Sequence, residues 1–412
     1  MKTTFWFLPL AFSTIALGDH AQGGQRGVRA LSAVAQTPIT TCTTITTSGS
    51  YQVIKPISGN NCLTVTAGSV SVSCAAGATI GNVASNQSQP AVNISNNASV
   101  TLTGCTVQVA GTSQTLITPP LSAINSTVTL TGDTVVGGET YLQSSATTIN
   151  GGTYETLQVN GGSATFNNNP SFTATPNRGY ITHVVWVNNG GVLFAYSGTL
   201  TGNWSGKTTE AVASTTGDGI DDTLLLDHVG SGGIVRNMSF TGAFDMGVEN
   251  IGLVAGWMIS DNQFSHMGYG CIGGWYASSW DGNNLQRNTC QVSANAVSPT
   301  PRLFSWAYYQ WGGAFDPIIY FRNNNVTDNL WVPDSTVRAG YALWLDSTFA
   351  TAYKSTLITS NNTFARNNFT SSATVPISAH MLPATAIIDG GGNSGTSVTW
   401  PDQAAPYPLK FQ

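Results

Sequence analysis

The sequence has 412 residues, which is enough for one long domain or two ordinary ones. Only 8% of the residues are charged, against about 25% in a typical globular domain. The formal net charge is −5, so the chain lacks the basic charge expected of a nucleic-acid-binding protein. Because 41% of the residues are hydrophobic, the composition also excludes an intrinsically disordered chain.

The amino terminus has the features of an export signal. Lys2 precedes an apolar stretch from Phe5 to Leu17, and small residues suited to cleavage follow it. We expect residues 1–18 to form a signal peptide, with cleavage as late as residue 35 as the alternative. A membrane anchor is the competing interpretation, but this stretch is short and no later segment is long enough to span a membrane. We therefore predict a secreted protein, extracellular or at the cell surface.

Export permits disulfide bonds, and an even number of cysteines allows all of them to pair. We expect Cys271 to pair with Cys290 and the remaining four cysteines to pair among themselves. Buried free thiols are the alternative. The six cysteines are Cys42, Cys62, Cys74, Cys105, Cys271 and Cys290.

Short alternating runs of apolar and polar residues fill the chain from residue 42 to about residue 167. Examples are the segments 63–66 (LTVT), 100–103 (VTLT) and 128–131 (VTLT), which Gly, Asn and Ser separate from their neighbours. Runs of this length and period predict β-strands rather than helices.

A seven-residue phrase recurs in the second half of the chain. It reads MISDNQF at 258–264, NLQRNTC at 284–290, YFRNNNV at 320–326 and ITSNNTF at 358–364, with a looser copy, IVRNMSF, at 234–240. The closing apolar residues are separated by 24, 26, 36 and 38 residues. Repeats of this length are typical of a solenoid or another repeat architecture.

Stacked coils explain the asparagine in each phrase, because one position of every coil forms a ladder along the axis with a spacing of about 4.8 Å. We expect Asn262, Asn288, Asn324 and Asn362 to form one such ladder and to serve a structural role. We also expect Asp261 and Arg287 to stack on adjacent coils as an ion pair. No linker interrupts the chain, so we predict a single domain over residues 36–400, with a tryptophan-rich half from about residue 180 and a tail at 401–412.

The opening of this domain resembles secreted right-handed parallel β-helix proteins of the pectin-lyase-like superfamily. The resemblance rests on segments 42–51 (CTTITTSGSY), 61–66 (NCLTVT) and 70–74 (VSVSC), and on the later Asn-x-Phe phrases. It implies an all-β fold, a right-handed single-stranded parallel β-helix (solenoid). The superfamily includes polysaccharide lyases, glycoside hydrolases, epimerases, adhesins and coat proteins, so the resemblance implies a polysaccharide or glycan partner without choosing the activity.

Aromatic residues concentrate in the long late coils, where they would stack on sugar rings; packing of loops onto the solenoid is the alternative. The candidate substrate-binding residues are Trp275, Tyr276, Trp280, Trp306, Tyr308, Tyr309, Trp311, Asp316, Trp344 and Asp346.

Ionisable residues near this cluster are the candidates for catalysis. Hydrolysis of a glycosidic bond needs two carboxyl groups, whereas β-elimination on a uronate needs a base, often Arg or Lys in this superfamily. A structural turn role is the alternative for the histidine. The candidate catalytic residues are Asp245, Glu249, Asp261, His266, Asp281 and Arg287.

The densest acidic segment, 217–222 (GDGIDD), faintly resembles the aspartate motifs of polygalacturonases, but the Gly-His-Gly and Arg-Ile-Lys motifs of that family are missing. Asp218, Asp221 and Asp222 are candidate ligands for Ca²⁺, which prefers oxygen atoms. A solvated Asp-Gly turn is the alternative, and no cofactor is certain.

The sequence thus predicts a secreted carbohydrate-active β-helix protein that binds a polysaccharide, with cleavage as a lyase or a glycoside hydrolase as the further expectation. The alternative is a non-catalytic extracellular glycan-binding, adhesin or structural surface protein. Ice binding through Thr-x-Thr rows is a third interpretation, which the small number and irregular spacing of these motifs disfavour. The sequence does not indicate the oligomeric state.

Overall fold

The computed structural model describes part of the chain, which divides into two units, Met1–Ala35 and Gln36–Gln412. The predicted signal peptide at 1–18 and the tail at 401–412 lie outside the described residues. The described residues are 35–66, 68–82, 89–109, 119–175, 183–205, 220–274, 278–292, 302–307, 318–333, 340–346, 356–369, 374–380, 387–389 and 394–395.

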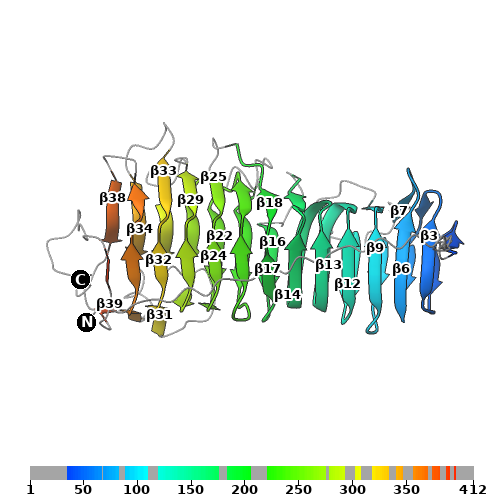
Figure 1. The fold of residues 1–412 in the computed structure, drawn as a ribbon, viewed down its shortest axis with the longest axis horizontal. Coiled ribbons are helices and arrows are strands. Elements are labelled where there is room, and N and C mark those ends of the chain that lie inside the picture. Colours follow the sequence, from blue (N-terminus) through cyan, green and yellow to red (C-terminus); the bar gives the residue numbers. More distant parts are fainter. Residues whose placement is uncertain are drawn as a thin grey trace, which may run out of the picture. The chain divides into compact units, whose positions relative to one another are not determined.

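All regular elements of the described part are β-strands, and all of their pairings are parallel. Within the second unit, strands of successive coils lie side by side (Figure 1). They form three ladders, called A, B and C here, which the chain visits in that order. Two long strands, β13 (Thr134–Asn150) and β14 (Thr153–Asn167), pass through all three ladders. The pairing is consistent with a β-solenoid, and the predicted all-β, parallel architecture is confirmed.

Besides these two strands, each ladder holds one strand from each coil. Ladder A contains β1 (Thr37–Ile39), β3 (Gly49–Val53), β6 (Ser69–Cys74), β9 (Ser99–Thr103), β12 (Thr127–Thr131), β17 (Val192–Ala195), β20 (Ile234–Arg236), β24 (Met258–Ser260), β28 (Asn284–Gln286), β32 (Asn325–Thr327), β36 (Thr363–Ala365) and β40 (Ser394–Gly395). Ladder B contains β4 (Ile57–Ser58), β7 (Thr79–Gly81), β10 (Thr106–Gln108), β15 (Ser171–Thr173), β18 (Gly198–Thr201), β21 (Met238–Thr241), β25 (Gln263–Met267), β29 (Thr289–Val292), β33 (Leu330–Pro333) and β37 (Asn368–Phe369).

Ladder C carries the strands that matter most for the candidate site. It contains β2 (Thr43–Ile45), β5 (Leu63–Val65), β8 (Val92–Ile94), β11 (Leu121–Ile124), β16 (His183–Asn188), β19 (Asp222–Asp227), β22 (Met246–Ile251), β26 (Gly270–Gly274), β30 (Arg302–Ala307), β34 (Gly340–Asp346) and β38 (Thr374–His380). A shorter ladder D is inserted between C and A in the later coils. It contains β23 (Leu253–Ala255), β27 (Ser279–Asp281), β31 (Ile318–Arg322), β35 (Thr356–Ser360) and β39 (Ile387–Asp389).

The core consists of apolar residues that stack in register from coil to coil. In ladder A, Val100 pairs with Val128 and Leu102 pairs with Leu130, and all four are buried. The intervening residue of each strand points the other way, because successive side chains of a strand alternate between its two faces. The alternating runs predicted from the sequence therefore place one apolar face inside every coil.

All six cysteines form disulfide bonds: Cys42 with Cys62, Cys74 with Cys105, and Cys271 with Cys290. This confirms the expected Cys271–Cys290 pair and the pairing of the other four among themselves, and it contradicts the alternative of free thiols. Three disulfides indicate an oxidising compartment.

The asparagines do form ladders, but the prediction of a single ladder was wrong. Asn262 bonds to Asn288, and that ladder continues through Asn329 and Asn367, at the corner between ladders A and B. Asn324 and Asn362 belong to a second ladder, which starts at Asn283 and lies between ladders D and A.

The physical reason is that the phrase recurs at two different corners of the coil. Cys290 pairs with Trp331 and not with Val326, which stacks on Leu285 instead. The two phrases at 320–326 and 358–364 therefore sit one corner earlier than the two before them.

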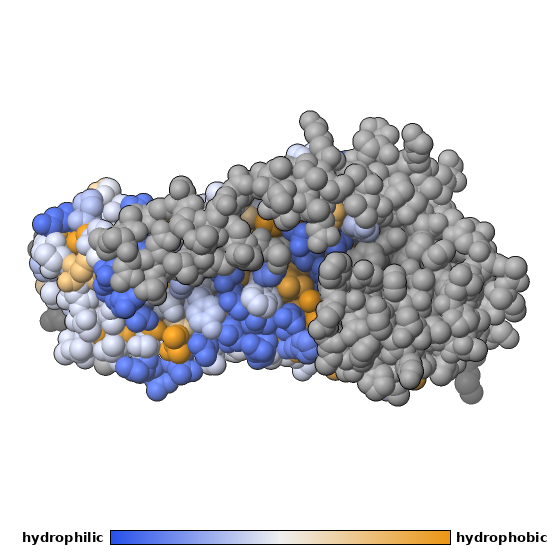
Figure 2. All heavy atoms as spheres, turned by 180° about the vertical axis from the view of Figure 1, so that it is seen from behind, coloured by the Kyte–Doolittle hydropathy of each residue, from blue (hydrophilic) through white to orange (hydrophobic). Residues whose placement is uncertain are grey.

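The described surface is polar with few apolar interruptions. Figure 2 shows hydrophilic and neutral residues over most of the described part of one face, with small, separate hydrophobic patches. The large hydrophobic side chains exposed in the described part are Ile54, Leu253 and Met258. A search for helices long and apolar enough to cross a membrane found none among the described residues.

Candidate acidic site

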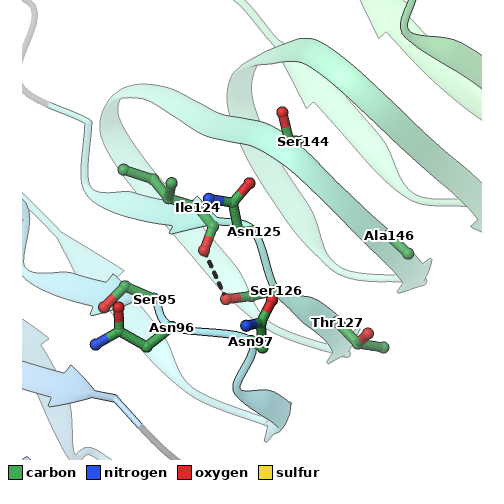
Figure 3. Close-up of a pocket in the computed structure, with 9 residues that line it drawn as sticks. All are labelled: Ser95, Asn96, Asn97, Ile124, Asn125, Ser126, Thr127, Ser144 and Ala146. Atoms are coloured by element: carbon green, nitrogen blue, oxygen red, sulfur yellow. Dashed lines mark hydrogen bonds between the residues drawn. The ribbon is translucent and has the colours of Figure 1, made fainter.

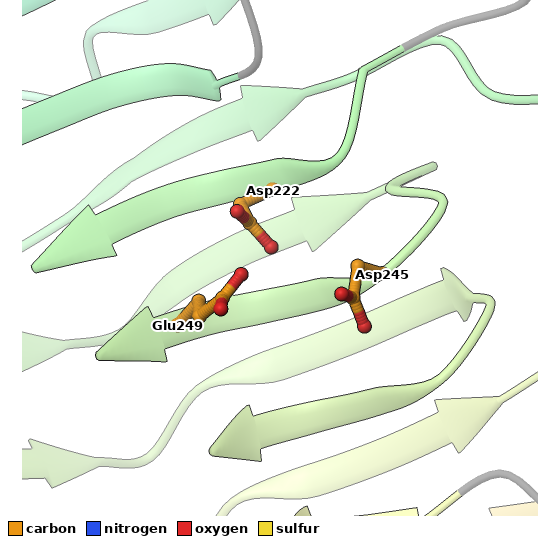
Figure 4. Close-up of side chains that lie close together, drawn as sticks. All are labelled: Asp222, Asp245 and Glu249. Carbon is orange, nitrogen blue, oxygen red and sulfur yellow. The ribbon is translucent and has the colours of Figure 1, made fainter. Parts of the chain in front are cut away.

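Three carboxyl groups meet at the edge of ladder C where its strands begin. Asp222 is the first residue of β19, Asp245 immediately precedes β22, and Glu249 lies within β22. One oxygen from each group lies within 4.8 Å of the other two. Figure 4 shows the side chains of Asp222 and Glu249 turned toward each other, with Asp245 beside them at the start of its strand. We call these three residues the acidic cluster.

The stacking of two coils brings the cluster together. β19 and β22 pair in parallel, with Leu224 opposite Val248. The backbone N–H of Asp245 donates to the carbonyl of Asp221 at 2.8 Å, and the N–H of Met246 donates to Oδ1 of Asp222 at 3.2 Å. Strands in one sheet lie about 4.8 Å apart, so residues of adjacent coils are held within reach of each other.

Burial controls the charge of the cluster. Asp222 and Glu249 are 4% exposed, and Asp245 is partly exposed. Burial raises the pKa of Asp222 well above its ordinary value, and the negative charge of Glu249, a hydrogen bond with Glu249 and the charges of Asp245 and Asp221 raise it further. Two carboxyl groups this close do not both ionise readily. We therefore read Asp222 and Glu249 as a pair that shares a proton.

Aromatic rings pack around Phe244, the residue before Asp245. The ring centroid of Phe244 lies 5.7 Å from that of Trp204 and 6.0 Å from that of Tyr269, both with edge contacts. The backbone N–H of Tyr269 donates to the carbonyl of Asp245 at 2.9 Å. Trp204 also lies 5.6 Å from the imidazole of His266. The candidate catalytic residue His266 thus lies on the next coil and joins the same aromatic group.

One further ionisable side chain stands in the same column of ladder C. His183 on β16 pairs with Asp222 in the register. Burial lowers the pKa of His183 to about 3, so its imidazole is uncharged near neutral pH. Its ring lies 4.9 Å from the ring of Trp186, which the sequence did not single out.

The structure groups the candidate site residues differently from the sequence prediction. Asp245 and Glu249, expected as catalytic residues, meet Asp222, expected as a metal ligand with Asp218 and Asp221. Asp218 lies outside the described residues. A signal for this grouping was present in the chain: Asp221 and Asp245 are 24 residues apart, the same spacing as that of Phe240 and Phe264.

The remaining catalytic candidates form surface ion pairs. Nε and Nη2 of Arg287 donate to the two carboxylate oxygens of Asp261, at 2.6 and 2.8 Å, which confirms the expected stacking of this pair. Asp281 accepts two hydrogen bonds from Arg322, at 2.7 and 2.9 Å. The hydrogen bonds from Arg287 lower the pKa of Asp261. Burial raises the pKa of Asp281, but hydrogen bonds from Arg322 and Asn323 outweigh this effect, so the pKa of Asp281 is also lowered. Neither aspartate therefore retains the proton that an acid catalyst would donate near neutral pH.

Of the expected sugar-stacking residues, Trp280 is a core residue. It is fully buried, and its indole N–H donates to the hydroxyl of Ser278 at 2.9 Å, so it offers no face to a ligand. Trp306 lies in β30, and Trp344 and Asp346 lie in β34, but their side chains are outside the described part. The other expected contacts also lie outside it: Trp275, Tyr276, Tyr308, Tyr309, Trp311 and Asp316.

The donor set of the acidic cluster consists of oxygen atoms only, which is the type that Ca²⁺ and Mg²⁺ prefer. A cation would have to displace the proton that Asp222 and Glu249 share. The cluster therefore has two possible chemistries: an acid pair that keeps a proton when no cation is bound, and a set of oxygen ligands when one is.

Comparisons with family models, with curated proteins and with solved structures found no match for this chain. The function is therefore argued from the geometry of the cluster.

Proposed function

We propose that this chain is a secreted carbohydrate-active protein with a right-handed parallel β-helix of the pectin-lyase-like kind, and that it hydrolyses a polysaccharide at the acidic cluster. The observation that carries the proposal is the meeting of Asp222, Asp245 and Glu249 within 4.8 Å, with the pKa of one of them strongly raised. The three disulfides support export, because such bonds persist in oxidising compartments.

The chemistry needs one carboxyl group that keeps its proton and one that is ionised. The proton shared by Asp222 and Glu249 supplies the acid, which protonates the glycosidic oxygen as the bond to the anomeric carbon breaks. Asp245 is less buried and is the candidate for the ionised group. Carboxyl groups about 5–5.5 Å apart are typical of retaining enzymes, and about 6.5–9.5 Å of inverting ones.

The short separation in the cluster favours the retaining course. Asp245 would attack the anomeric carbon and form a glycosyl ester, and water would then cleave this ester while the acid pair accepts the proton of the water. The lyase alternative requires a base together with a cation that neutralises a uronate. The shared proton between two carboxyl groups supports hydrolysis over that elimination.

The test is an assay of the purified protein on neutral and acidic polysaccharides, with reducing ends and the ultraviolet absorbance of unsaturated uronates followed together. We expect reducing ends without absorbance. Asp245→Asn and Glu249→Gln should each abolish turnover while the far-ultraviolet circular dichroism stays unchanged. Asp328→Asn is the matched control, because it removes a partly exposed carboxylate that pairs with the exposed Arg366 and should leave turnover intact. Ultraviolet absorbance from an unsaturated uronate would show that the reaction is elimination and not hydrolysis.

The burial of Asp222 and Glu249 supports a second candidate, a non-catalytic extracellular protein that binds glycans or forms a structural surface. In that case the acids stabilise the fold, no substrate of the panel yields product, and the protein is retained on an immobilised glycan.

A further inference from the structure

A polar notch opens at the corner between ladders C and A, away from the acidic cluster. Its volume is about 520 Å³. Figure 3 shows the residues that line it, which come from the corners of three successive coils. They are Ser95, Asn96, Asn97, Ile124, Asn125, Ser126, Thr127, Ser144 and Ala146.

Unequal turn lengths create the notch. The first of the three corners holds the four residues 95–98 between β8 and β9, whereas the next two hold only residues 125–126 and 144–145. The notch lies at the step between this longer turn and the two shorter ones. The following corner is formed by Gly161 and Gly162, which add no side chains, so the step stays open on that side.

The backbone holds the asparagines of this corner in fixed positions. Asn96, Asn97 and Asn125 have φ of 60°, 60° and 49°, in the left-handed region that asparagine tolerates better than most residues. The N–H of Asn97 donates to the carbonyl of Asn125 at 3.0 Å, and the N–H of Asn125 donates to that of Gln143 at 2.9 Å. The corners are therefore tied to each other through their backbones.

The side-chain amides of these three asparagines are exposed and make no hydrogen bond within the described part of the chain. Each amide can both donate and accept. A ligand that enters the notch thus meets donors and acceptors whose backbone is already ordered, and binding loses less entropy at such a site.

The residues that line the notch favour an uncharged ligand over a charged one. It contains amides, hydroxyls and the partly exposed side chain of Ile124, but no ionisable group. Amides and hydroxyls suit the hydroxyl groups of a sugar, and Ile124 with Ala146 offers apolar surface to its C–H groups. The volume lies within the range of about 300–1,000 Å³ that is typical of small-molecule sites. We infer that the notch binds a short segment of a neutral polysaccharide.

Rows of hydroxyl groups continue from the notch over ladder A. Thr127, which lines the notch, begins β12, and Thr129 and Thr131 follow at alternate positions. Thr129 stacks between Thr101 of β9 and Thr148 of β13. A neutral chain that leaves the notch can therefore follow a surface of the same hydrogen-bonding character.

The notch and the acidic cluster lie on opposite edges of ladder C. The notch follows the ends of β8 and β11, whereas the acids stand where β19 and β22 begin. Four strand pairings separate β11 from β19, which corresponds to about 19 Å along the stack at about 4.8 Å for each step. The inference therefore does not depend on the proposed hydrolysis.

The test uses the double substitution Asn96→Gly with Asn125→Gly, which removes two amides and retains the left-handed backbone. Binding of β-1,4-linked glucan, mannan and xylan oligosaccharides is measured by calorimetry in the Asp245→Asn background, so that cleavage cannot confuse the result. We expect saturable binding of at least one of them, weakened about tenfold or more by the double substitution. Asn168→Gly is the matched control, because Asn168 has a similar φ of 56° and does not line the notch; it should bind like the parent.

Equal affinity of the double variant and the parent would overturn the inference, and so would the absence of binding to all three neutral probes. Stronger binding of oligogalacturonate than of the neutral probes, lost in the double variant, would also overturn it, because the ligand would then be an anion. These results are independent of turnover by the unsubstituted protein: loss of activity in Asp245→Asn supports the acidic cluster whether or not the notch binds.

Discussion

The side chain of Asn288 donates to Oδ1 of Asn329 at 3.1 Å and thereby joins two coils whose asparagines are 41 residues apart. The same amide also donates to the carbonyl of Ile259 at 2.9 Å, and Oδ1 of Asn288 accepts from the backbone and side chain of Asn262. A single buried residue therefore satisfies polar groups of three coils. Such amide ladders stabilise stacked strands.

Replacement of this residue should destabilise the fold strongly. Asn288→Ala leaves buried donors and acceptors on the neighbouring coils without partners, and each such group costs about 1–3 kcal/mol. We expect a loss of about 3 kcal/mol or more in the free energy of unfolding, measured by denaturant titration. Asn284→Ala is the control, because Asn284 is only half-buried and accepts bonds of 3.4 and 3.5 Å. A loss as small as that of the control would show that the ladder contributes little.

The ion pair of Asp261 and Arg287 should contribute little by comparison. Its arginine is exposed, and exposed pairs are weak because water and salt screen them. Arg287→Gln should leave the unfolding midpoint and the turnover of any substrate nearly unchanged, and any small effect on stability should shrink as salt is added. A large loss of activity at unchanged stability would indicate that Arg287 has a catalytic role after all.

Stability should fall as the pH rises from about 4 to about 6. Burial raises the pKa of Asp133 from 3.8 to about 6, although the N–H groups of Cys105 and Thr131 oppose this. The folded state therefore binds a proton that the unfolded state releases, and the stabilisation is complete below the unfolded pKa and lost above the folded one. At about 1.4 kcal/mol per pKa unit, the change is on the order of 3 kcal/mol.

Unfolding titrations at several pH values measure this dependence. Asp133→Asn should make the profile less steep over this interval, because one of the responsible carboxyl groups is absent. Burial also raises the pKa of Glu139 from 4.5 to about 7. The slope that remains in Asp133→Asn should therefore extend up to about pH 7. A profile that rises between pH 4 and pH 6 would contradict both assignments.

Hydrolysis should require the protonated acid pair and therefore fail at high pH. Because burial and Glu249 raise the pKa of Asp222, kcat/KM should stay high well above the ordinary pKa of an aspartate and then fall as this pair ionises. Glu249→Gln removes the neighbouring charge and should shift the titration of Asp222 to lower pH. The carboxyl ¹³C chemical shift of Asp222, followed over pH in both proteins, measures this change. An unchanged titration would show that Asp222 and Glu249 do not interact.

Several features could be predicted from the sequence because they depend on local patterns. The alternation of Thr, Val and Leu predicts strands with one buried face, and the repeated phrase predicts stacked coils; both are properties of short segments. The pair of Asp261 and Arg287 was predictable because their spacing equals the local repeat. The sequence also indicated the pair of Cys271 and Cys290, which are the two cysteines of the second half of the chain.

The tertiary structure alone decided which residues meet across coils of unequal length. The later coils contain ladder D, and one of them is 41 residues long, so that Val326 stacks on Leu285. The asparagine phrases therefore lie at two corners of the coil, whereas their spacing in the sequence indicated a single corner. In the same way, parallel pairing of β19 with β22 joins Asp222 to Glu249. Coil length varies freely in loops, whereas contact is set by the hydrogen-bonded register, and only the folded chain shows that register.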